Sequence, residues 1–193
     1  DFLSGDVLLA LFGREAASAG ERVAVPVDTS LAVADYLAEG GIGTTRTPVG
    51  DVYVAAAASE PDVAFGGEPS GAWIWPGETL CPDGPLAACK LAALAAERPL
   101  ADRAADIDTY PIRRTSVEVD DKTAVMDRVR EAVGERDDDV STLDGVRVDR
   151  GDGWFLLRAS GTQPLVRVTA EARDGDRAEE IFGEATALLE SAR

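Results

Sequence analysis

The sequence predicts an α/β domain followed by a smaller α+β domain with an antiparallel sheet. Over about residues 21–100, short apolar strands alternate with helical segments, which is typical of a layered α/β domain. Residues 98–108 contain Pro99 and several acids, so they are interpreted as a linker. From Tyr110 onward, strand-like segments separated by turns accompany two helical segments, and this pattern favours an antiparallel sheet.

The first half of the chain opens on a helical segment whose apolar residues recur at helical spacing and which Gly20 ends. A side chain at 28–30 can cap the second helix, and Pro48 suits the first turn of the third. Gly84 and Pro85 then open a long helix rich in Ala and Leu. The expected helices are 6–19, 31–39, 48–58 and 84–97, and the expected strands are 22–27, 42–47, 63–65 and 72–75.

In the second half, a turn at 149–153 that is rich in Asp and Gly separates two strand-like segments. An amphipathic segment follows the last strand and predicts a final helix. The expected strands are 110–119, 140–148, 154–159 and 165–172, and the expected helices are 122–133 and 177–192.

The chain is strongly acidic, with 36 acidic residues, 19 basic residues and a net charge of −17. Such a surface repels nucleic-acid backbones and anionic lipid, so we expect neither nucleic acid nor membrane as a partner. Only Lys90 and Lys122 are lysines, and Asp outnumbers Glu. Scarce lysine and abundant aspartate favour a halophilic protein, in which concentrated salt screens the repulsion, over a merely soluble acidic one.

Histidine is absent, which excludes Ser-His-Asp and Cys-His catalysis and histidine-ligated metal sites within this chain. Cys81 and Cys89 have neither the spacing of a metal site nor that of a disulfide framework, and we expect Cys89 to be a small core residue. No apolar run is long enough to span a bilayer and no signal peptide is visible, so we expect a cytoplasmic protein.

The segment 158–164 (Arg-Ala-Ser-Gly-Thr-Gln-Pro) contains the groups that hold a phosphate dianion. Arg158 offers a planar donor fork, and Ser160 and Thr162 offer hydroxyls. Gly161 lets backbone N–H groups turn inward as an anion nest. The alternative is an ordinary hairpin turn, for which these residue types are also common. Arg167, early in the next strand, is either a second cation on the same anion or an exposed strand arginine.

The loop 66–71 (Gly-Gly-Glu-Pro-Ser-Gly) follows a buried-looking strand. The carboxylate of Glu68, with Ser70 beside it, can accept hydrogen bonds from two neighbouring sugar hydroxyls, or it can simply cap a turn. Arg46 could supply a cation at the end of an earlier strand, although a solvated strand end is the simpler interpretation. Trp73 and Trp75 are more typical of core packing than of a wall on which a sugar ring stacks.

Four segments resemble, in this order along the chain, the motifs of the α-D-phosphohexomutase superfamily, which comprises phosphoglucomutases, phosphomannomutases and phosphoglucosamine mutases. They are 46–51 (Arg-Thr-Pro-Val-Gly-Asp), 67–71 (Gly-Glu-Pro-Ser-Gly), 81–84 (Cys-Pro-Asp-Gly) and 158–164. In the superfamily, segments similar to 67–71 recognise the sugar and those similar to 158–164 bind phosphate. Gln163 departs from the usual Glu. Ala72 stands where many bacterial members have His, and Ala72 and the segment 81–84 make the chain more similar to archaeal members.

The resemblance covers nearly the whole chain and implies its domain organisation. Residues 1–20 would be the terminal helix of a missing preceding domain, and 21–100 would be domain III, a three-layer α/β/α unit. Residues 107–193 would be domain IV, a smaller unit similar to the TATA-binding protein. Members also have domains I and II, which carry a phosphorylated serine and an Asp-rich Mg²⁺-binding loop, and neither motif occurs in this sequence.

By this resemblance the chain is the C-terminal fragment of an intramolecular phosphotransferase that interconverts hexose 1-phosphate and hexose 6-phosphate. The reaction would pass through a phosphoserine and a 1,6-bisphosphate of the glucose 1,6-bisphosphate type, with Mg²⁺ bound outside this chain. The fragment would hold no catalytic residue and no metal ligand, and it would be inactive without domains I and II. The alternative is a non-catalytic module that binds sugar phosphates. Which hexose is bound (glucosamine, glucose or mannose) stays open.

The resemblance also assigns roles to individual side chains. The implied sugar-binding residues are Glu68, Ser70 and Arg46, and the implied phosphate-binding residues are Arg158, Ser160, Gly161, Thr162 and, more weakly, Arg167.

Overall fold

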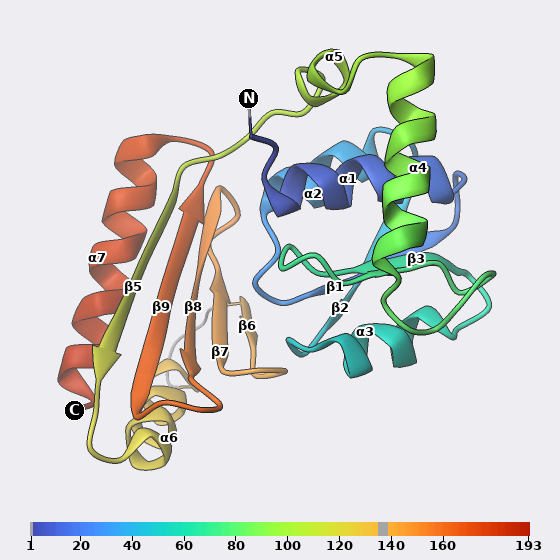
Figure 1. Ribbon diagram of the computed structural model, residues 1–193. Coiled ribbons are helices and arrows are strands. Elements are labelled where there is room, and N and C mark those ends of the chain that lie inside the picture. The colour runs from blue at the N-terminus through green and yellow to red at the C-terminus, as the bar shows by residue number, and fades with distance from the viewer. Residues whose placement is uncertain (1, 135–138) are drawn as a thin grey trace. The chain divides into compact units, whose positions relative to one another are not determined.

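The computed structural model describes residues 2–134 and 139–193, which form two compact units that meet in the chain between Thr109 and Tyr110 (Figure 1). The boundary follows the segment that we predicted as a linker, but that segment is not without structure, because it contains the short helix α5 (Leu100–Ala104). Pro99 occupies the N-cap position of α5. Arg98 bonds to the carbonyl of Asp102 and to the carboxylate of Asp106, which ties the two ends of this turn together.

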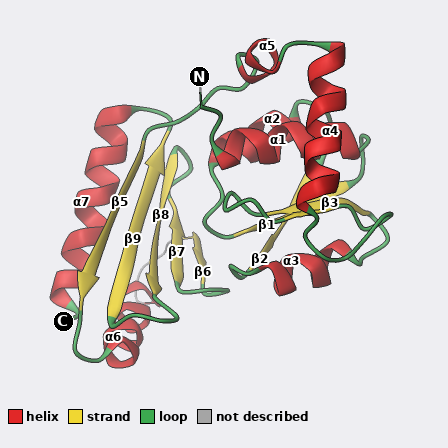
Figure 2. Ribbon diagram, viewed as in Figure 1, coloured by secondary structure: helices red, strands yellow, loops and turns green. Residues whose placement is uncertain are grey.

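The first unit is a mixed sheet between helices, with strand order β2-β1-β3-β4. Strand β1 is parallel to β2 and β3, whereas β4 is antiparallel to β3. Helices α1 and α2 lie on one face of the sheet and α3 lies on the other (Figures 1 and 2). The predicted α/β class is confirmed, with these elements: α1 Gly5–Ala16, β1 Arg22–Pro26, α2 Leu31–Ala38, β2 Gly43–Thr47, α3 Asp51–Ala58, β3 Val63–Gly67, β4 Trp73–Ile74 and α4 Gly84–Glu97.

An aromatic cluster forms the centre of this unit. Phe12 on α1 packs against Phe65 on β3 and against Trp73 and Trp75, with ring centroids 5.2–6.1 Å from its own. Both tryptophans are buried, as expected for core residues. Helix α1 therefore completes the core of the first unit, which differs from our expectation that residues 1–20 belong to a preceding domain. Residues 2–16 fold with the strands that follow them because Phe12 has its hydrophobic partners there.

The second unit is an antiparallel sheet with strand order β5-β9-β8-β7-β6, and the predicted α+β class is confirmed. Helices α6 and α7 cover one face, where Phe155, Leu157 and Val168 of the strands pack with Val129 and Ile181 of the helices. The elements are β5 Ile112–Glu118, α6 Lys122–Gly134, β6 Asp139–Ser141, β7 Val146–Asp149, β8 Gly153–Ala159, β9 Leu165–Ala172 and α7 Gly175–Ser191.

The segment 140–148 forms two strands, where we predicted one. The chain turns back between β6 and β7, and Gly145 has a φ of +87° in this turn. A side chain at this position would place its Cβ 2.3 Å from the carbonyl oxygen of Leu157 on the neighbouring strand. Glycine therefore permits both the turn and the close approach of β8.

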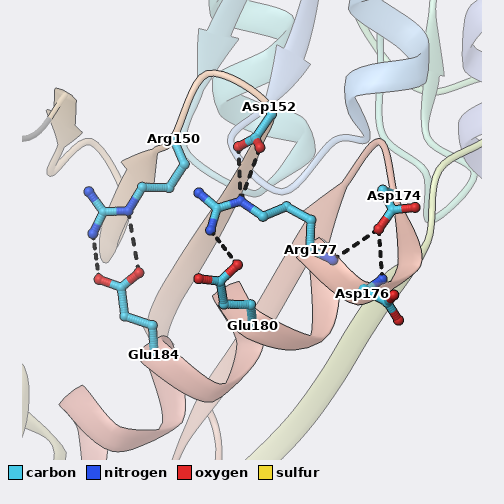
Figure 3. A network of polar contacts seen from close by, with 7 residues as sticks. All are labelled: Arg150, Asp152, Asp174, Asp176, Arg177, Glu180 and Glu184. Atoms are coloured by element: carbon cyan, nitrogen blue, oxygen red, sulfur yellow. Dashed lines mark hydrogen bonds and ion pairs between the residues drawn. The ribbon is translucent and has the colours of Figure 1, made fainter.

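A network of ion pairs ties the hairpin between β7 and β8 to helix α7 (Figure 3). Arg150 pairs with Glu184, and Arg177 bonds to Asp152 at 3.0 Å and to Glu180 at 2.7 Å. These hydrogen bonds, first to Glu180 and then to Asp152, raise the pKa of the Arg177 guanidinium above its ordinary value. The network fixes the hairpin through charged groups that remain partly in contact with solvent.

The start of α7 is fixed next to this network. Asp174 accepts hydrogen bonds from the N–H groups of Asp176 and Arg177, at 2.9 and 3.2 Å, and so caps the helix (Figure 3).

On the sheet face away from α6 and α7, a carboxylate is buried. Glu171 on β9 has no solvent exposure, and its Oε2 accepts a hydrogen bond of 2.7 Å from the indole N–H of Trp154. The guanidinium of Arg147 lies 3.7 Å from the centroid of the same indole ring. A buried carboxylate is costly unless such donors and cations compensate it, so this cluster holds β7, β8 and β9 in one register.

One smaller prediction was wrong. Cys89 is exposed, because the buried face of α4 is formed by Ala87 and Leu94 and Cys89 lies off that face. Within the described residues, no helix is both long and apolar enough to cross a membrane.

We predict that Trp154→Phe lowers the free energy of unfolding, because the buried carboxylate of Glu171 would lose one of its donors. A hydrogen bond to a charged group contributes about 1.5–3 kcal/mol, and the lost ring volume adds to this. Urea denaturation would measure the change. Trp73→Phe is the matched control, since it removes a similar volume from a buried tryptophan without touching Glu171. Equal losses in the two variants would contradict the role given to the Trp154–Glu171 hydrogen bond.

Candidate functional site

The first candidate site lies at the carboxyl ends of the parallel strands. The chain passes from β1 to β2 on one side of β1, and it then crosses to β3 on the other side. The order of the strands therefore reverses between β1 and β3, which makes this position the switch point of the sheet. Ligands of open α/β sheets bind at the carboxyl edge at such points. Glu68 directly follows β3 and therefore stands at this edge.

The carboxylate of Glu68 is buried, with 8% of the residue exposed, and each of its oxygens has one donor. Oε1 accepts a hydrogen bond of 2.7 Å from the backbone N–H of Gly50, and Oε2 accepts one from the Ser70 hydroxyl at 3.4 Å. A carboxylate has about four lone-pair sites, so acceptor capacity remains for further donors. The structure thus brings Glu68 and Ser70 together in an arrangement that can receive hydroxyl groups.

Gly50 is a residue of this site that the sequence analysis did not single out. It stands at the N-cap of α3 with a φ of +136°, a conformation that only glycine adopts without strain. The ring of Tyr53 lies so close that a Cβ on Gly50 would be 3.3 Å from it. The segments 46–51 and 66–71, which are separate in sequence, therefore meet at one hydrogen bond. The feature of the sequence from which Gly50 could have been predicted is its place between a strand and a helix.

Arg46 lies on β2 in register with Val25, one position before the end of the strand. Its residue is partly buried, and the following Thr47 is buried and donates its hydroxyl to the carbonyl of Pro48 at 2.8 Å. Arg46 therefore stands near the same edge of the sheet as Glu68, since β2 and β3 both run parallel to β1.

The second candidate site is the loop between β8 and β9. The N–H of Ser160 donates to the carbonyl of Leu165 at 2.9 Å, and the N–H of Gln163 donates to the Ser160 hydroxyl oxygen at 3.3 Å. Ser160 is buried, and its hydroxyl proton remains able to donate because only the oxygen is used as an acceptor. These bonds close the loop around Gly161 and Thr162.

The N–H groups of Gly161 and Thr162 have no acceptor among the residues that the structure describes, and both residues are exposed. Both N–H groups are therefore available to a bound anion. Gly161 does not have a positive φ, so the loop lacks the αR-αL form of the anion nest that we predicted at this glycine. The loop therefore has the donors that a phosphate group needs.

Arg158 lies at the end of β8 and lines a hollow of about 180 Å³. Its guanidinium is 3.5 Å from the carboxylate of Asp144, and both side chains are largely covered. Lys122 and Arg130 of α6 line the same hollow. Lys122 and Asp144 were not predicted as site residues, because the fold, and not their spacing, brings them beside Arg158.

Arg167 is placed differently from the expected second cation on one anion. It is exposed and stands directly opposite Arg158 in the β8–β9 ladder. It lines a separate hollow of about 270 Å³, which it shares with Arg114, Ser116 and Thr169. Adjacent strand positions keep Arg167 close to Arg158, yet the two guanidinium groups do not line the same hollow.

No group of three or more potential metal ligands lies together in residues 2–134 and 139–193. The groups that the two sites present are a buried carboxylate with a neighbouring hydroxyl in one unit, and a loop of N–H donors next in sequence to an arginine in the other. Both arrangements can recognise a ligand through hydrogen bonds and charge.

Comparison with known proteins assigns both units to one protein family. A family model described as phosphoglucomutase/phosphomannomutase, alpha/beta/alpha domain III, matches residues 4–110, and the model of the C-terminal domain of that family matches residues 115–188. The chain is 47% identical over 167 residues to a probable phosphoglucosamine mutase of Methanopyrus kandleri, covering 84% of this chain and 37% of that protein. It is 41% identical to a probable phosphoglucosamine mutase of Methanococcoides burtonii, covering 100% of this chain and 44% of that protein.

The chain thus spans less than half the length of these curated relatives. Among solved structures, it is similar to a phosphoglucomutase/phosphomannomutase family protein of Burkholderia thailandensis, with a TM-score of 0.85 and 22% identity over 100% of this chain and 42% of that one. It is also similar in fold to Aspergillus fumigatus N-acetylphosphoglucosamine mutase, with a TM-score of 0.75 and 18% identity over 100% of this chain and 44% of that one. The chain belongs to the phosphoglucomutase/phosphomannomutase family and comprises its domain III and its C-terminal domain.

Proposed function

We propose that this chain is the substrate-holding half of a phosphohexomutase, which moves a phosphoryl group between the 1- and 6-positions of a hexose. The observation that carries the proposal is the loop 160–163, which directly follows the strand that ends with Arg158 and Ala159 and in which two N–H groups have no acceptor among the described residues. The relatives named as probable phosphoglucosamine mutases favour glucosamine phosphate as the substrate.

The loop would bind the phosphate group that is not reacting. Gly161 and Thr162 would donate their N–H groups, Ser160 and Thr162 their hydroxyls, and Arg158 a charged pair of N–H groups. Arg167 would add long-range attraction from the neighbouring strand. Binding at this remote group holds the reacting end of the sugar in place, which is how enzymes use binding energy away from the reacting atoms.

The carboxylate of Glu68 would accept hydrogen bonds from two neighbouring sugar hydroxyls, with the hydroxyl of Ser70 as a further partner. In a mutase the sugar must bind in two orientations, since each of its two phosphate positions reacts in turn. A carboxylate suits this demand, because its two oxygens accept hydrogen bonds from either member of a hydroxyl pair. Arg46 would contribute positive charge at the same edge of the sheet.

The reacting groups would come from the rest of the protein. We propose that domains I and II supply the phosphorylated serine and the Mg²⁺ ligands, and that this chain alone does not turn over substrate. Magnesium is present in the structure of the Aspergillus fumigatus enzyme with GlcNAc-6P, and a bound Mg²⁺ stabilises charge on a transferring phosphoryl group. The described residues of this chain offer no cluster that fits such an ion.

The second candidate function is a module that binds sugar phosphates without converting them. It predicts tight binding by the 193-residue chain alone, whereas half of a divided substrate site predicts weak binding. Calorimetric titration with glucosamine 6-phosphate would separate the two functions.

We predict that Arg158→Ala in the whole enzyme lowers kcat/KM at least about tenfold, since one charge-assisted hydrogen bond to the phosphate is lost. Arg130→Ala is the matched control, because Arg130 lines the same hollow but pairs with Asp127. A steady-state mutase assay measures both variants. If Arg158→Ala were as active as Arg130→Ala, the loop would not be the phosphate site.

We predict that Glu68→Gln lowers kcat/KM by about tenfold and leaves the melting temperature nearly unchanged, because glutamine keeps an acceptor for Gly50 but presents an amide donor to the sugar. Glu78→Gln, a change at an exposed position, is the control. The same assay and a thermal melt decide the outcome. A large fall in melting temperature with normal turnover would assign Glu68 a role in folding alone.

A further inference from the structure

Lys122 contacts the loop 160–163 from helix α6, 38 residues away from Ser160 in sequence. Its ammonium group donates to the carbonyl oxygen of Ser160 and lies 3.4 Å from that of Gln163. These two carbonyls stand on either side of Gly161 and Thr162 in the chain. One ammonium group therefore joins the two ends of the segment that presents the unpaired N–H groups.

The hydrogen bond from Lys122 to the Ser160 carbonyl also fixes the direction in which the N–H of Gly161 points. The carbonyl of Ser160 and the N–H of Gly161 belong to one peptide group, and the described chain contains no cis peptide bond. In a trans peptide the C=O and N–H bonds point to opposite sides. When Lys122 draws the Ser160 carbonyl toward α6, the N–H of Gly161 turns away from the ammonium group, and it is open to solvent because Gly161 is exposed.

The position of Lys122 is not explained by the helix in which it lies. It is the first residue of α6, directly after Asp121, whose Oδ1 accepts hydrogen bonds of 3.0 Å from the N–H groups of Thr123 and Ala124. A cation at the start of a helix is disfavoured by the helix dipole. The chain has only two lysines among 19 basic residues, so lysine is also not its usual choice of cation.

Lysine has the chemistry that this contact requires. An ammonium is a compact charge with three donors on a flexible stem, which can reach two carbonyl oxygens at once. The positive charge of the ammonium group also offsets the partial negative charge of the two carbonyl oxygens, which would otherwise repel a dianion bound nearby. The planar fork of arginine fits two carbonyls that belong to different peptide groups less well.

We propose that Lys122 is a positioning residue of the phosphate loop: it holds the Ser160 and Gln163 carbonyls and thereby orients the Gly161 N–H toward the phosphate. The inference rests on the proposed function of this loop. It adds a residue that lies outside the motif 158–164 and acts on substrate through the backbone.

The kinetic test compares Lys122→Met, Lys122→Arg and Lys90→Met in the whole enzyme. Lys90 is the matched control, because it is the other lysine and lies near Trp75 in the first unit. We expect Lys122→Met to raise KM about tenfold with little change in kcat, since a misdirected donor weakens ground-state and transition-state binding alike. Lys122→Arg should recover part of this loss. A fall in kcat at unchanged KM, which a smaller folded fraction would produce, would overturn the proposal.

A second measurement reads the loop directly. With glycine labelled by ¹⁵N in the 193-residue chain, the Gly161 amide signal should shift saturably on titration with inorganic phosphate, and Lys122→Met should weaken this response while Lys90→Met should not. If Arg158→Ala abolishes the response and Lys122→Met leaves it intact, the Lys122 inference fails and the proposed function stands. If the unaltered chain gives no response and Arg158→Ala does not impair the whole enzyme, the proposed function fails and the inference falls with it.

Discussion

A site that binds an anion through backbone N–H groups requires those groups to be left without partners, and in the function that we propose the second unit meets this constraint. In a sheet, most N–H groups are used by neighbouring strands. The ladder between β8 and β9 ends at Ala159 and Val166, and a few local hydrogen bonds then hold the loop in shape without using the donors of Gly161 and Thr162. The packing of α6 and α7 against the sheet supplies the rigidity that this open loop does not have itself.

In the proposed function the first unit meets the opposite requirement, since it would keep an acceptor available in a nearly buried position. Glu68 is held by one backbone donor and one hydroxyl, and neither of them neutralises its charge with a cation. An arginine partner would have bound the carboxylate in a bidentate pair and removed its capacity to accept sugar hydroxyls. The glycine at position 50 allows the chain to bring an N–H group there, so the carboxylate is oriented and its remaining lone pairs stay free.

Local patterns in the sequence predicted most of the elements, and they also selected the candidate site residues whose roles remain proposals. Alternation of strands and helices gave the two fold classes, and the segments around Glu68 and Arg158 contain their own turn and donor residues. The patterns did not predict α5, the division of 140–148 into two strands, or the exposure of Cys89, since each of these depends on packing. The contributions of Gly50 and Lys122 were not predicted either. Their partners are 18 and 38 residues away, and nothing in the local spacing joins them.

The unpaired N–H groups of the phosphate loop also affect how this protein can diverge. A donor that belongs to the main chain is present whatever side chain the position carries, provided that the backbone can still adopt the same path. A complete substitution library of residues 159–164 should therefore be permissive at Gln163, whose side chain is exposed, and restrictive at Ala159, which packs against the core, and where a residue controls the course of the backbone. The part of anion recognition that rests on N–H groups would then be inherited as a path of the backbone, whereas the part that rests on Arg158 would depend on its side chain.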